Sequence, residues 1–198
     1  SRRRRQASGA TEGRAGPASR RLIVDDGRRP VTIEALPTAL VLTVSDGVSA
    51  GTRNDESGGR LAQRLEGEGF EVERGTVPDD AAAIASAVRE GADQHRLVIT
   101  TGGTGLTTRD VTPQAIEPLL DYVVPGLAEL MRAHGLRSTP HAALSRSLAG
   151  VIGRTLVLAV PGSPKGALES LEAVLPVIPH ALETLADDSS RHVTTSPR

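Results

Sequence analysis

The sequence has no cysteine and no tryptophan among its 198 residues. The lack of cysteine excludes disulfide bonds, thiolate metal sites and cysteine nucleophiles. Phe70 and Tyr122 are the only phenylalanine and tyrosine, so we do not expect nucleic-acid bases to be recognised by stacking on aromatic rings. The five histidines show neither metal-ligand spacing nor a serine partner, so we predict no hydrolase triad.

An excess of charge of one sign is also missing. Lys and Arg together number 23 against 24 Asp and Glu, which gives a net charge of -1. This balance argues against general affinity for nucleic acid or membranes. No apolar run approaches the length of a membrane span, and no secretory signal pattern is visible. We therefore expect a cytoplasmic protein that binds neither nucleic acid nor membrane.

The composition divides the chain into a folded domain and two tails. Residues 1–21 carry seven arginines and almost no large apolar side chains, which is typical of a disordered basic tail. Residues 22–33 add two short β-like runs around an Asp-Gly turn. We expect residues 1–37 to lie outside the main domain, residues 38–187 to form it, and residues 188–198 to be a loose polar tail.

Within 38–187, apolar runs alternate with helical patterns. Continuous apolar runs at 39–44, 96–101 and 155–160 predict strands covered on both faces, and 70–74 alternates like a half-exposed strand. Apolar residues spaced three and four apart predict the intervening helices, which we expect to end near Gly67, Gly91 and Gly135. The pattern predicts an α/β fold in three layers, with a mostly parallel sheet flanked by helices.

The stretch 100–113, TTGGTGLTTRDVTP, is the richest in functional signals. Its glycines remove side chains that would keep a ligand away from the backbone. Thr112 and Pro113 are typical of a capped helix start. A strand end, a bare loop and a helix N-terminus together can bind an anion, most simply phosphate. The alternative is a tight glycine turn that binds nothing.

Three more loops should meet this stretch, because the carboxyl ends of parallel strands share one edge of the sheet. They are 45–47, 78–80 and 161–166. The edge would then gather acidic and basic side chains suited to Mg²⁺ with a nucleotide; these are Asp46, Asp79 or Asp80, Asp110, Arg109 and Lys165.

Each of these residues also has a simpler explanation. Asp79 and Asp80 are natural helix caps, as is Ser163. Asp110 could pair with its neighbour Arg109. Lys165, the only lysine, could be solvated, but a cation is disfavoured at a helix N-terminus, so a bound anion explains its position better.

These loops resemble those of the MoaB/Mog family of molybdenum cofactor biosynthesis proteins, the molybdopterin adenylyltransferases. The matching motifs are Ser45–Gly47, Val77–Asp79, Thr101–Gly105 with Arg109–Pro113, and Pro161–Pro164. The resemblance spans about 38–187 and implies the molybdopterin-binding fold. It also implies transfer of AMP from Mg-ATP to the terminal phosphate of molybdopterin, with release of pyrophosphate.

The resemblance further implies roles for individual residues. Asp79 and Asp110 would be the catalytic acids and would hold Mg²⁺, while Ser45 and Asp46 would contact the nucleotide. The residues expected to hold molybdopterin and its phosphate are Thr101, Gly102, Gly103, Thr104, Gly105, Arg109, Pro161, Gly162, Ser163, Lys165 and Gly166.

Because the attacking phosphate is already anionic, we expect the two acids to position Mg²⁺ and ATP without accepting a proton. Family members are usually trimers and sometimes hexamers, so we expect a homo-oligomer that acts on small molecules and contacts other molybdenum cofactor enzymes. Two alternatives remain open: a non-catalytic pterin-binding or carrier subunit of the same fold, and a generic nucleotide-binding module.

Overall fold

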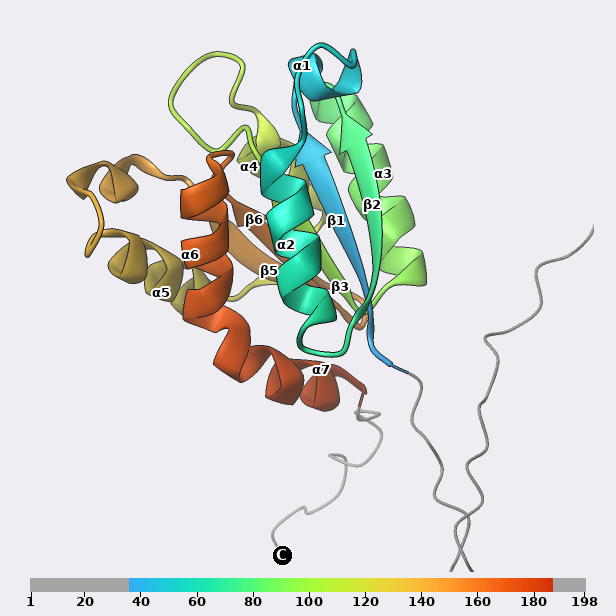
Figure 1. Ribbon diagram of the computed structural model, residues 1–198. Coiled ribbons are helices and arrows are strands. Elements are labelled where there is room, and N and C mark those ends of the chain that lie inside the picture. Colours follow the sequence, from blue (N-terminus) through green and yellow to red (C-terminus); the bar gives the residue numbers. More distant parts are fainter. Residues whose placement is uncertain (1–35, 187–198) are drawn as a thin grey trace, which may run out of the picture. The chain divides into compact units, whose positions relative to one another are not determined.

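A computed structural model describes residues 36–186. One six-stranded sheet runs through it in the order β2-β1-β3-β6-β5-β4 (Figure 1). The strands are β1 Thr38–Val44, β2 Glu71–Val77, β3 Leu97–Thr101, β4 Tyr122–Val123, β5 Leu148–Ile152 and β6 Thr155–Val160. The first four strands in that order are parallel, whereas β5 and β4 are added antiparallel. Residues 1–35 of the predicted first tail, 1–37, and all of the predicted second tail, 188–198, lie outside the described residues.

Helices cover both faces of the sheet and make three layers. On one face lie α2 Glu56–Glu66, α5 Pro125–Gly135, α6 Pro164–Val174 and α7 Ile178–Ala186. On the other lie α3 Ala81–Gln94 and α4 Thr112–Ile116. Short helical turns complete the chain: α1 Asp46–Ser49, η1 Glu117–Leu119, η2 Pro140–Leu144 and η3 Leu175–Val177. The predicted three-layer α/β fold is confirmed. Among the described residues, no helix has the length and apolar character needed to cross a bilayer.

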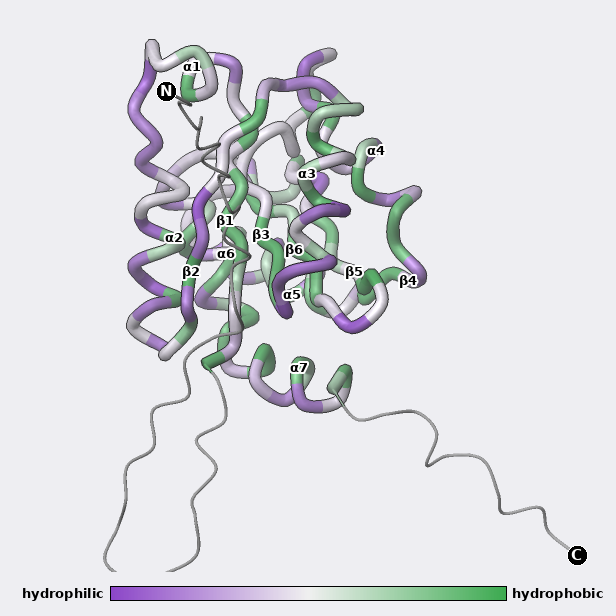
Figure 2. The backbone as a smooth tube through the Cα atoms, turned by 90° about the vertical axis from the view of Figure 1, so that its right-hand side faces the viewer, coloured by the Kyte–Doolittle hydropathy of each residue, from purple (hydrophilic) through white to green (hydrophobic). Residues whose placement is uncertain are grey.

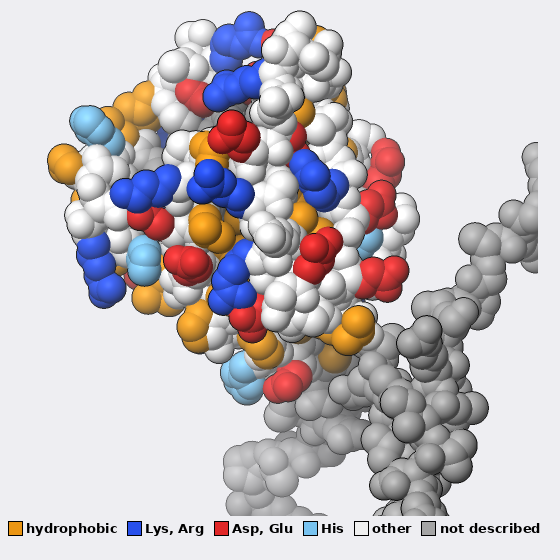
Figure 3. Space-filling model, in the orientation of Figure 1, with side chains coloured by type: hydrophobic (Ala, Val, Ile, Leu, Met, Phe, Trp, Pro, Cys, Tyr) orange, Lys and Arg blue, Asp and Glu red, His pale blue; other side chains and the backbone are white. Residues whose placement is uncertain are grey.

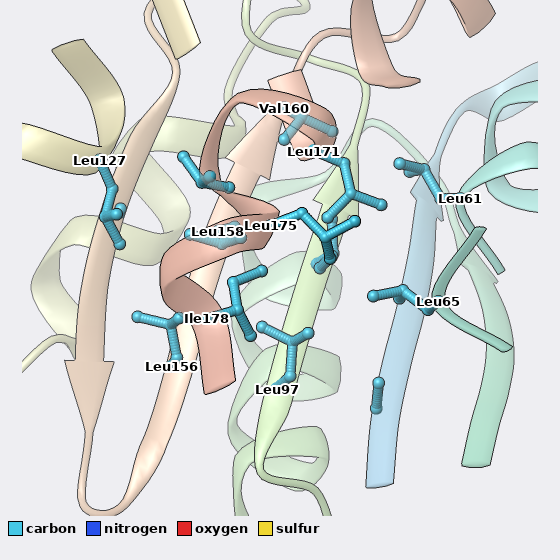
Figure 4. Close-up of a cluster of buried hydrophobic side chains, with 14 of the residues drawn as sticks. Leu61, Leu65, Leu97, Leu127, Leu156, Leu158, Val160, Leu171, Leu175 and Ile178 are labelled. Carbon is cyan, nitrogen blue, oxygen red and sulfur yellow. The ribbon is translucent and has the colours of Figure 1, made fainter. Parts of the chain in front are cut away.

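The two faces of the sheet explain the continuous apolar runs. In β1, Ala39 and Val41 belong to the core beneath α2 and α6, whereas Leu40 and Leu42 belong to the core beneath α3. Side chains alternate across a strand, so a strand covered on both sides must be apolar at every position. Figure 2 shows this as hydrophobic colour along the central strands. Figure 4 shows Leu61 and Leu65 of α2 beside β1 and Leu171 of α6 beside β3, in one buried cluster with leucines of β3 and β6.

Several predicted boundaries were wrong. Strand β2 runs to Val77 and is longer than predicted. Helix α3 does not end at Gly91 but continues to Gln94. Gly91 is instead a contact position, because a Cβ there would lie 2.5 Å from Leu40 Cδ2. In α5, Leu130 lies three residues after the buried Leu127 but is itself 47% exposed.

Two further features differ from the sequence prediction. Thr112 does not cap α4, because the cap position is Val111 and the Thr112 hydroxyl donates to the Gly102 carbonyl at 2.9 Å. Strands β4 and β5 were not predicted. The first has only two residues, and the second contains Gly150 and comes after a polar segment, so neither shows a clear period.

Gly150 lies where the antiparallel edge of the sheet has no room for a side chain. A Cβ there would lie 2.4 Å from Leu120 Cδ1 and 2.8 Å from the Tyr122 carbonyl oxygen. Since backbone must move to admit it, we expect Gly150→Ala to lower the free energy of unfolding by about 1–3 kcal/mol. Gly126→Ala, in open space on a helix, should raise it by up to about 1 kcal/mol. Urea denaturation measures both, and equal midpoints would contradict the prediction.

Candidate functional site

The carboxyl ends of β1, β2, β3 and β6 lie at one edge because these strands are parallel. Figure 1 shows α1, the long loop before α4 and the start of α6 together at that edge. The four loops named from the sequence therefore form one region of the molecule. Figure 3 shows that charges of both signs are interspersed on the face covered by α2 and α6.

Asp46 and Asp79 are joined by two hydrogen bonds, each from the backbone amide of one residue to the carboxylate of the other. The Asp46 amide donates to Asp79 Oδ2 at 3.1 Å, and the Asp79 amide donates to Asp46 Oδ1 at 2.9 Å. The guanidinium of Arg109 forms an ion pair with Asp46 and lies 3.8 Å from Asp79 Oδ2. Arg109 thus faces these two acids and not its neighbour Asp110. Asp80, next in the chain, caps α3 by accepting from the Ala83 amide at 2.8 Å.

Asp110 is fixed by its own loop. Its Oδ2 accepts from the Thr107 hydroxyl at 2.6 Å and from the Thr107 amide at 2.8 Å. The Thr107 hydroxyl is the main cause of a lowered pKa at Asp110, and the nearby charge of Arg146 contributes to it. Burial raises the pKa of Asp79, and the negative charge of Asp110 raises it further. The two acids therefore lie close enough to interact but are held in different environments.

The glycines of the long loop are needed for packing. Gly102 has φ +108°, and a Cβ there would lie 2.3 Å from the Val44 carbonyl oxygen. A Cβ at Gly162 would lie 3.0 Å from the Gly102 Cα. The loops after β3 and β6 therefore touch backbone to backbone. We call this contact of Gly102–Gly103 with Gly162–Ser163 the glycine seam.

A cavity opens on each side of the glycine seam. The α5–α6 cavity has a volume of about 370 Å³ and extends from Gly105 and Asp110 to α5, η2 and α6. The α2 cavity has a volume of about 710 Å³ and extends from Ser45 and Asp79 to the start of α2. Both are lined by Gly103, Gly162 and Ser163. The seam is thus a shared wall between two adjoining binding spaces.

The predicted site residues divide between these spaces. Those lining the α5–α6 cavity are Gly103, Thr104, Gly105, Asp110, Pro161, Gly162, Ser163 and Gly166. Those lining the α2 cavity are Ser45, Asp79, Thr101, Gly102, Gly103, Gly162 and Ser163.

Asp46, Arg109 and Lys165 line neither cavity. The Lys165 side chain is 74% exposed, with its Nζ 3.7 Å from Glu169 Oε1. Ser163 caps α6, as predicted, by accepting from the Gly166 amide at 3.2 Å.

Arg146 is a residue of this site that sequence reasoning missed. Its Nε donates to the Gly105 carbonyl at 2.7 Å, and its guanidinium also donates to the Asp110 carbonyl. Its own amide donates to the Thr104 carbonyl at 2.9 Å. A single arginine in a chain rich in arginine carries no local signal. Only the fold brings it to the loop more than thirty residues earlier.

The acidic groups fit a magnesium ion only in part. Within residues 36–186 no three His, Asp or Glu side chains are grouped closely enough to hold a metal. Asp46 and Asp79 do present carboxylate oxygens to one cation, which here is the Arg109 guanidinium. Because Mg²⁺ is commonly bound by one or two carboxylates together with substrate phosphates and water, this donor set suits Mg²⁺ that arrives with a nucleotide.

Residues 40–180 match the family of molybdenum cofactor biosynthesis proteins described as "Probable molybdopterin binding domain". A molybdopterin adenylyltransferase of Helicobacter pylori is 37% identical over 150 residues, 73% of this chain and 85% of that protein. The crystal structure of the molybdopterin biosynthesis enzyme MoaB from Thermus thermophilus superposes with a TM-score of 0.73 at 52% identity, covering 77% of this chain and 98% of that one.

Some relatives are much longer. Gephyrin of Dictyostelium discoideum is 41% identical over 154 residues, 72% of this chain, but these are only 21% of the gephyrin sequence. For two other relatives, the matched residues are 26% and 53% of the relative's length. This chain therefore spans between about a fifth and about half of the length of these three proteins.

Replacing Arg146 should loosen the long loop. Arg146→Ala leaves the Gly105 and Asp110 carbonyls without their donor, so we expect a loss of about 1–3 kcal/mol of local stability. Amide hydrogen exchange over 102–111 should accelerate. The pKa of Asp110, followed by carboxyl-carbon NMR, should rise toward its ordinary value because a neighbouring positive charge is lost. Arg137→Ala, at an exposed position just after α5, is the control and should change neither quantity.

Asp79 should make stability depend on pH. Its pKa is raised above 3.8 by burial and by Asp110, so the folded protein binds this proton more tightly than the unfolded chain. The resulting contribution to the free energy of unfolding is fully present below pH 3.8 and is lost as pH rises through the pKa of Asp79 in the folded protein. We expect Asp79→Asn to raise the unfolding temperature at pH 7, with a difference that shrinks below about pH 4. Thermal denaturation across pH measures this, with Asp93→Asn as the exposed control. A lower unfolding temperature for Asp79→Asn at pH 7 would show that the prediction is wrong.

Proposed function

Because this chain belongs to the molybdenum cofactor biosynthesis family with a molybdopterin-binding domain, we propose that it is a molybdopterin adenylyltransferase. The reaction transfers AMP from Mg-ATP to the terminal phosphate of molybdopterin and releases pyrophosphate. The observation that carries the proposal is the pair of cavities sharing the glycine seam. A reaction between two phosphorylated molecules needs two spaces that open onto each other.

We assign ATP to the α2 cavity and molybdopterin to the α5–α6 cavity. The α2 cavity contains Ser45 and Asp79 together with Asn54 and the start of α2, which suits a charged, hydrated ligand. The α5–α6 cavity adds the apolar side chains of Met131 and Leu144, which suit a flat heterocycle. With this assignment the two reacting phosphates approach each other at the seam.

The reaction forms one bond and breaks one. An oxygen of the molybdopterin phosphate attacks the α-phosphorus of ATP, and the bond to the bridging oxygen of pyrophosphate breaks. The attacking oxygen is already anionic, so no side chain has to remove a proton. What the protein must supply is position and neutralisation of charge.

The chain's own groups meet that requirement. Asp79 and Asp110 would hold Mg²⁺ together with substrate phosphate and water, and the bound ion would offset phosphate charge and orient ATP. Arg109 faces Asp46 and Asp79 and would contact phosphate once a cation occupies these acids. The backbone amides of Gly162 and Ser163, the exposed residues of the seam, would bind phosphate oxygens, as glycine-rich loops do. Arg146 keeps the loop that carries Asp110 in place.

The family resemblance also supports a homo-oligomer, which we propose to be a trimer acting in the cytoplasm beside other molybdenum cofactor enzymes. Exposed apolar residues on the described part are compatible with subunit contacts; they include Leu130 and Leu136.

Asp110→Asn tests the catalytic proposal. The amide oxygen of asparagine can still accept from Thr107, so the fold should be retained while one negative charge is lost. Because removal of one electrostatic contact to a transition state costs about 10²–10³-fold in rate, we expect AMP transfer to fall by that factor. The assay measures adenylated product from molybdopterin and labelled ATP. Asp93→Asn, exposed on α3, is the matched control, and EDTA should abolish transfer by the wild type.

The same assay separates the alternatives. Near-wild-type transfer by Asp110→Asn under saturating Mg²⁺ would refute the assignment of Asp110. A wild-type protein that binds molybdopterin but forms no adenylated product would be a carrier subunit. ATP binding with no dependence on the pterin would indicate a general nucleotide-binding module.

A further inference from the structure

The α5–α6 cavity is lined by a second acidic side chain besides Asp110. Glu169 lies on α6 and is 19% exposed, and it lines the cavity together with Ser170. Acidic side chains that are mostly removed from water are costly unless they are paired or bind a ligand. The proposed AMP transfer uses Asp110 but gives Glu169 no role.

One oxygen of Glu169 is held and the other is free. The Ser138 hydroxyl donates to Oε1 at 2.6 Å, and Lys165 Nζ lies 3.7 Å from the same oxygen. Among residues 36–186, Oε2 has neither a hydrogen bond nor an ion pair. Ser138 therefore fixes the orientation of the carboxylate while leaving an acceptor open. A purely structural link between α6 and the segment after α5 would need only the hydrogen bond from Ser138, and would not need a free acceptor facing the cavity.

The walls of the cavity indicate what this acceptor would meet. Met131, Ala142 and Leu144 give it an apolar side, and the seam gives it a side of backbone and hydroxyl groups. Such a space suits a flat, polar heterocycle whose faces lie on apolar atoms and whose edge makes directed hydrogen bonds. The edge that a carboxylate recognises best carries two adjacent N–H donors.

We propose that Glu169 is the residue that selects the pterin, by accepting hydrogen bonds from the 2-amino group and the neighbouring ring N3–H. The proposal rests on the proposed function, in which this cavity takes molybdopterin. Oε2 is free for one of these donors, and Oε1 keeps a second lone pair beside its bond from Ser138. Replacing the 2-amino group by an oxygen would set two acceptors against each other. Glu169 is therefore a specificity residue that contacts substrate away from the reacting phosphate.

The experiment compares two fluorescent probes, 6-hydroxymethylpterin and 6-hydroxymethyllumazine, which differ by an amino group against an oxygen at position 2. Dissociation constants are measured by fluorescence titration for the wild type and for Glu169→Gln. Glutamine keeps an oxygen that accepts from Ser138, so the link between the two segments is retained. Glu172→Gln is the matched control, since Glu172 is exposed on the same helix and lines neither the α5–α6 cavity nor the α2 cavity.

We expect the wild type to bind the pterin at least about tenfold more tightly than the lumazine. Glu169→Gln should lose about ten- to a hundredfold in pterin affinity, the effect of losing hydrogen bonds to a charged group. Its lumazine affinity should stay the same or rise, because the glutamine amide can donate to the 2-oxygen. Glu172→Gln should bind both probes as the wild type does.

Four results would overturn the proposal. The wild type could fail to distinguish the probes or fail to bind the pterin, and Glu169→Gln could retain the wild-type preference or lose affinity equally for both probes. The AMP-transfer assay on the same proteins separates this failure from that of the proposed function. Adenylation by a wild type without pterin preference removes only the role of Glu169. Pterin preference without adenylation removes only the transferase activity.

Discussion

The structure depends on the contact between two loops that have no side chains where they meet. The backbones after β3 and β6 come so close together that a Cβ on Gly162 would lie 3.0 Å from the Gly102 Cα. Gly102 also lies against the Val44 carbonyl, so the end of β1 joins the same contact. Three strand ends are thereby fixed relative to one another. Both cavities owe their shared wall, and their adjacency, to this packing.

A second constraint is electrostatic, and it opposes stability. Asp79 is partly buried near Asp110, and both effects raise the pKa of Asp79. The protein offsets this with two arginines placed differently: Arg109 faces Asp46 and Asp79, whereas Arg146 binds the backbone beneath Asp110. Strain of this kind is common at functional sites, where a group is kept in a charged form that the fold alone would not favour. A cation bound at these acids would relieve it.

The sequence was most informative where one physical cause acts locally. The runs at 39–44, 96–101 and 155–160 predicted central strands because burial on both faces requires apolar residues at every position. The caps at Asp80 and Ser163 were also foreseen, since each depends on one side chain and the amide three residues later. Thr112 shows the limit of that reasoning. A cap would need its hydroxyl to accept from a nearby backbone amide, but in the folded loop the hydroxyl donates to the distant Gly102 carbonyl.

The residues that could not be foreseen are those whose role comes from distant contacts. Arg146 and Glu169 look like ordinary surface residues in the sequence, and both reach the site only after β5 and α6 are placed. The glycine-rich loops come directly after strands, so their sequence pattern is strong. The α5–α6 cavity is walled largely by α5, η2 and the segment leading to β5, where the pattern is weak.

Phosphate binding needs backbone amides in a fixed turn, and the spacing of glycines in the sequence predicts such a turn. Selection of one heterocycle needs a few side chains at the right distance from that turn, which spacing does not record. Phosphate binding is therefore assigned to the glycine seam, which both cavities share. Selection of the heterocycle is assigned to the outer wall of the α5–α6 cavity alone.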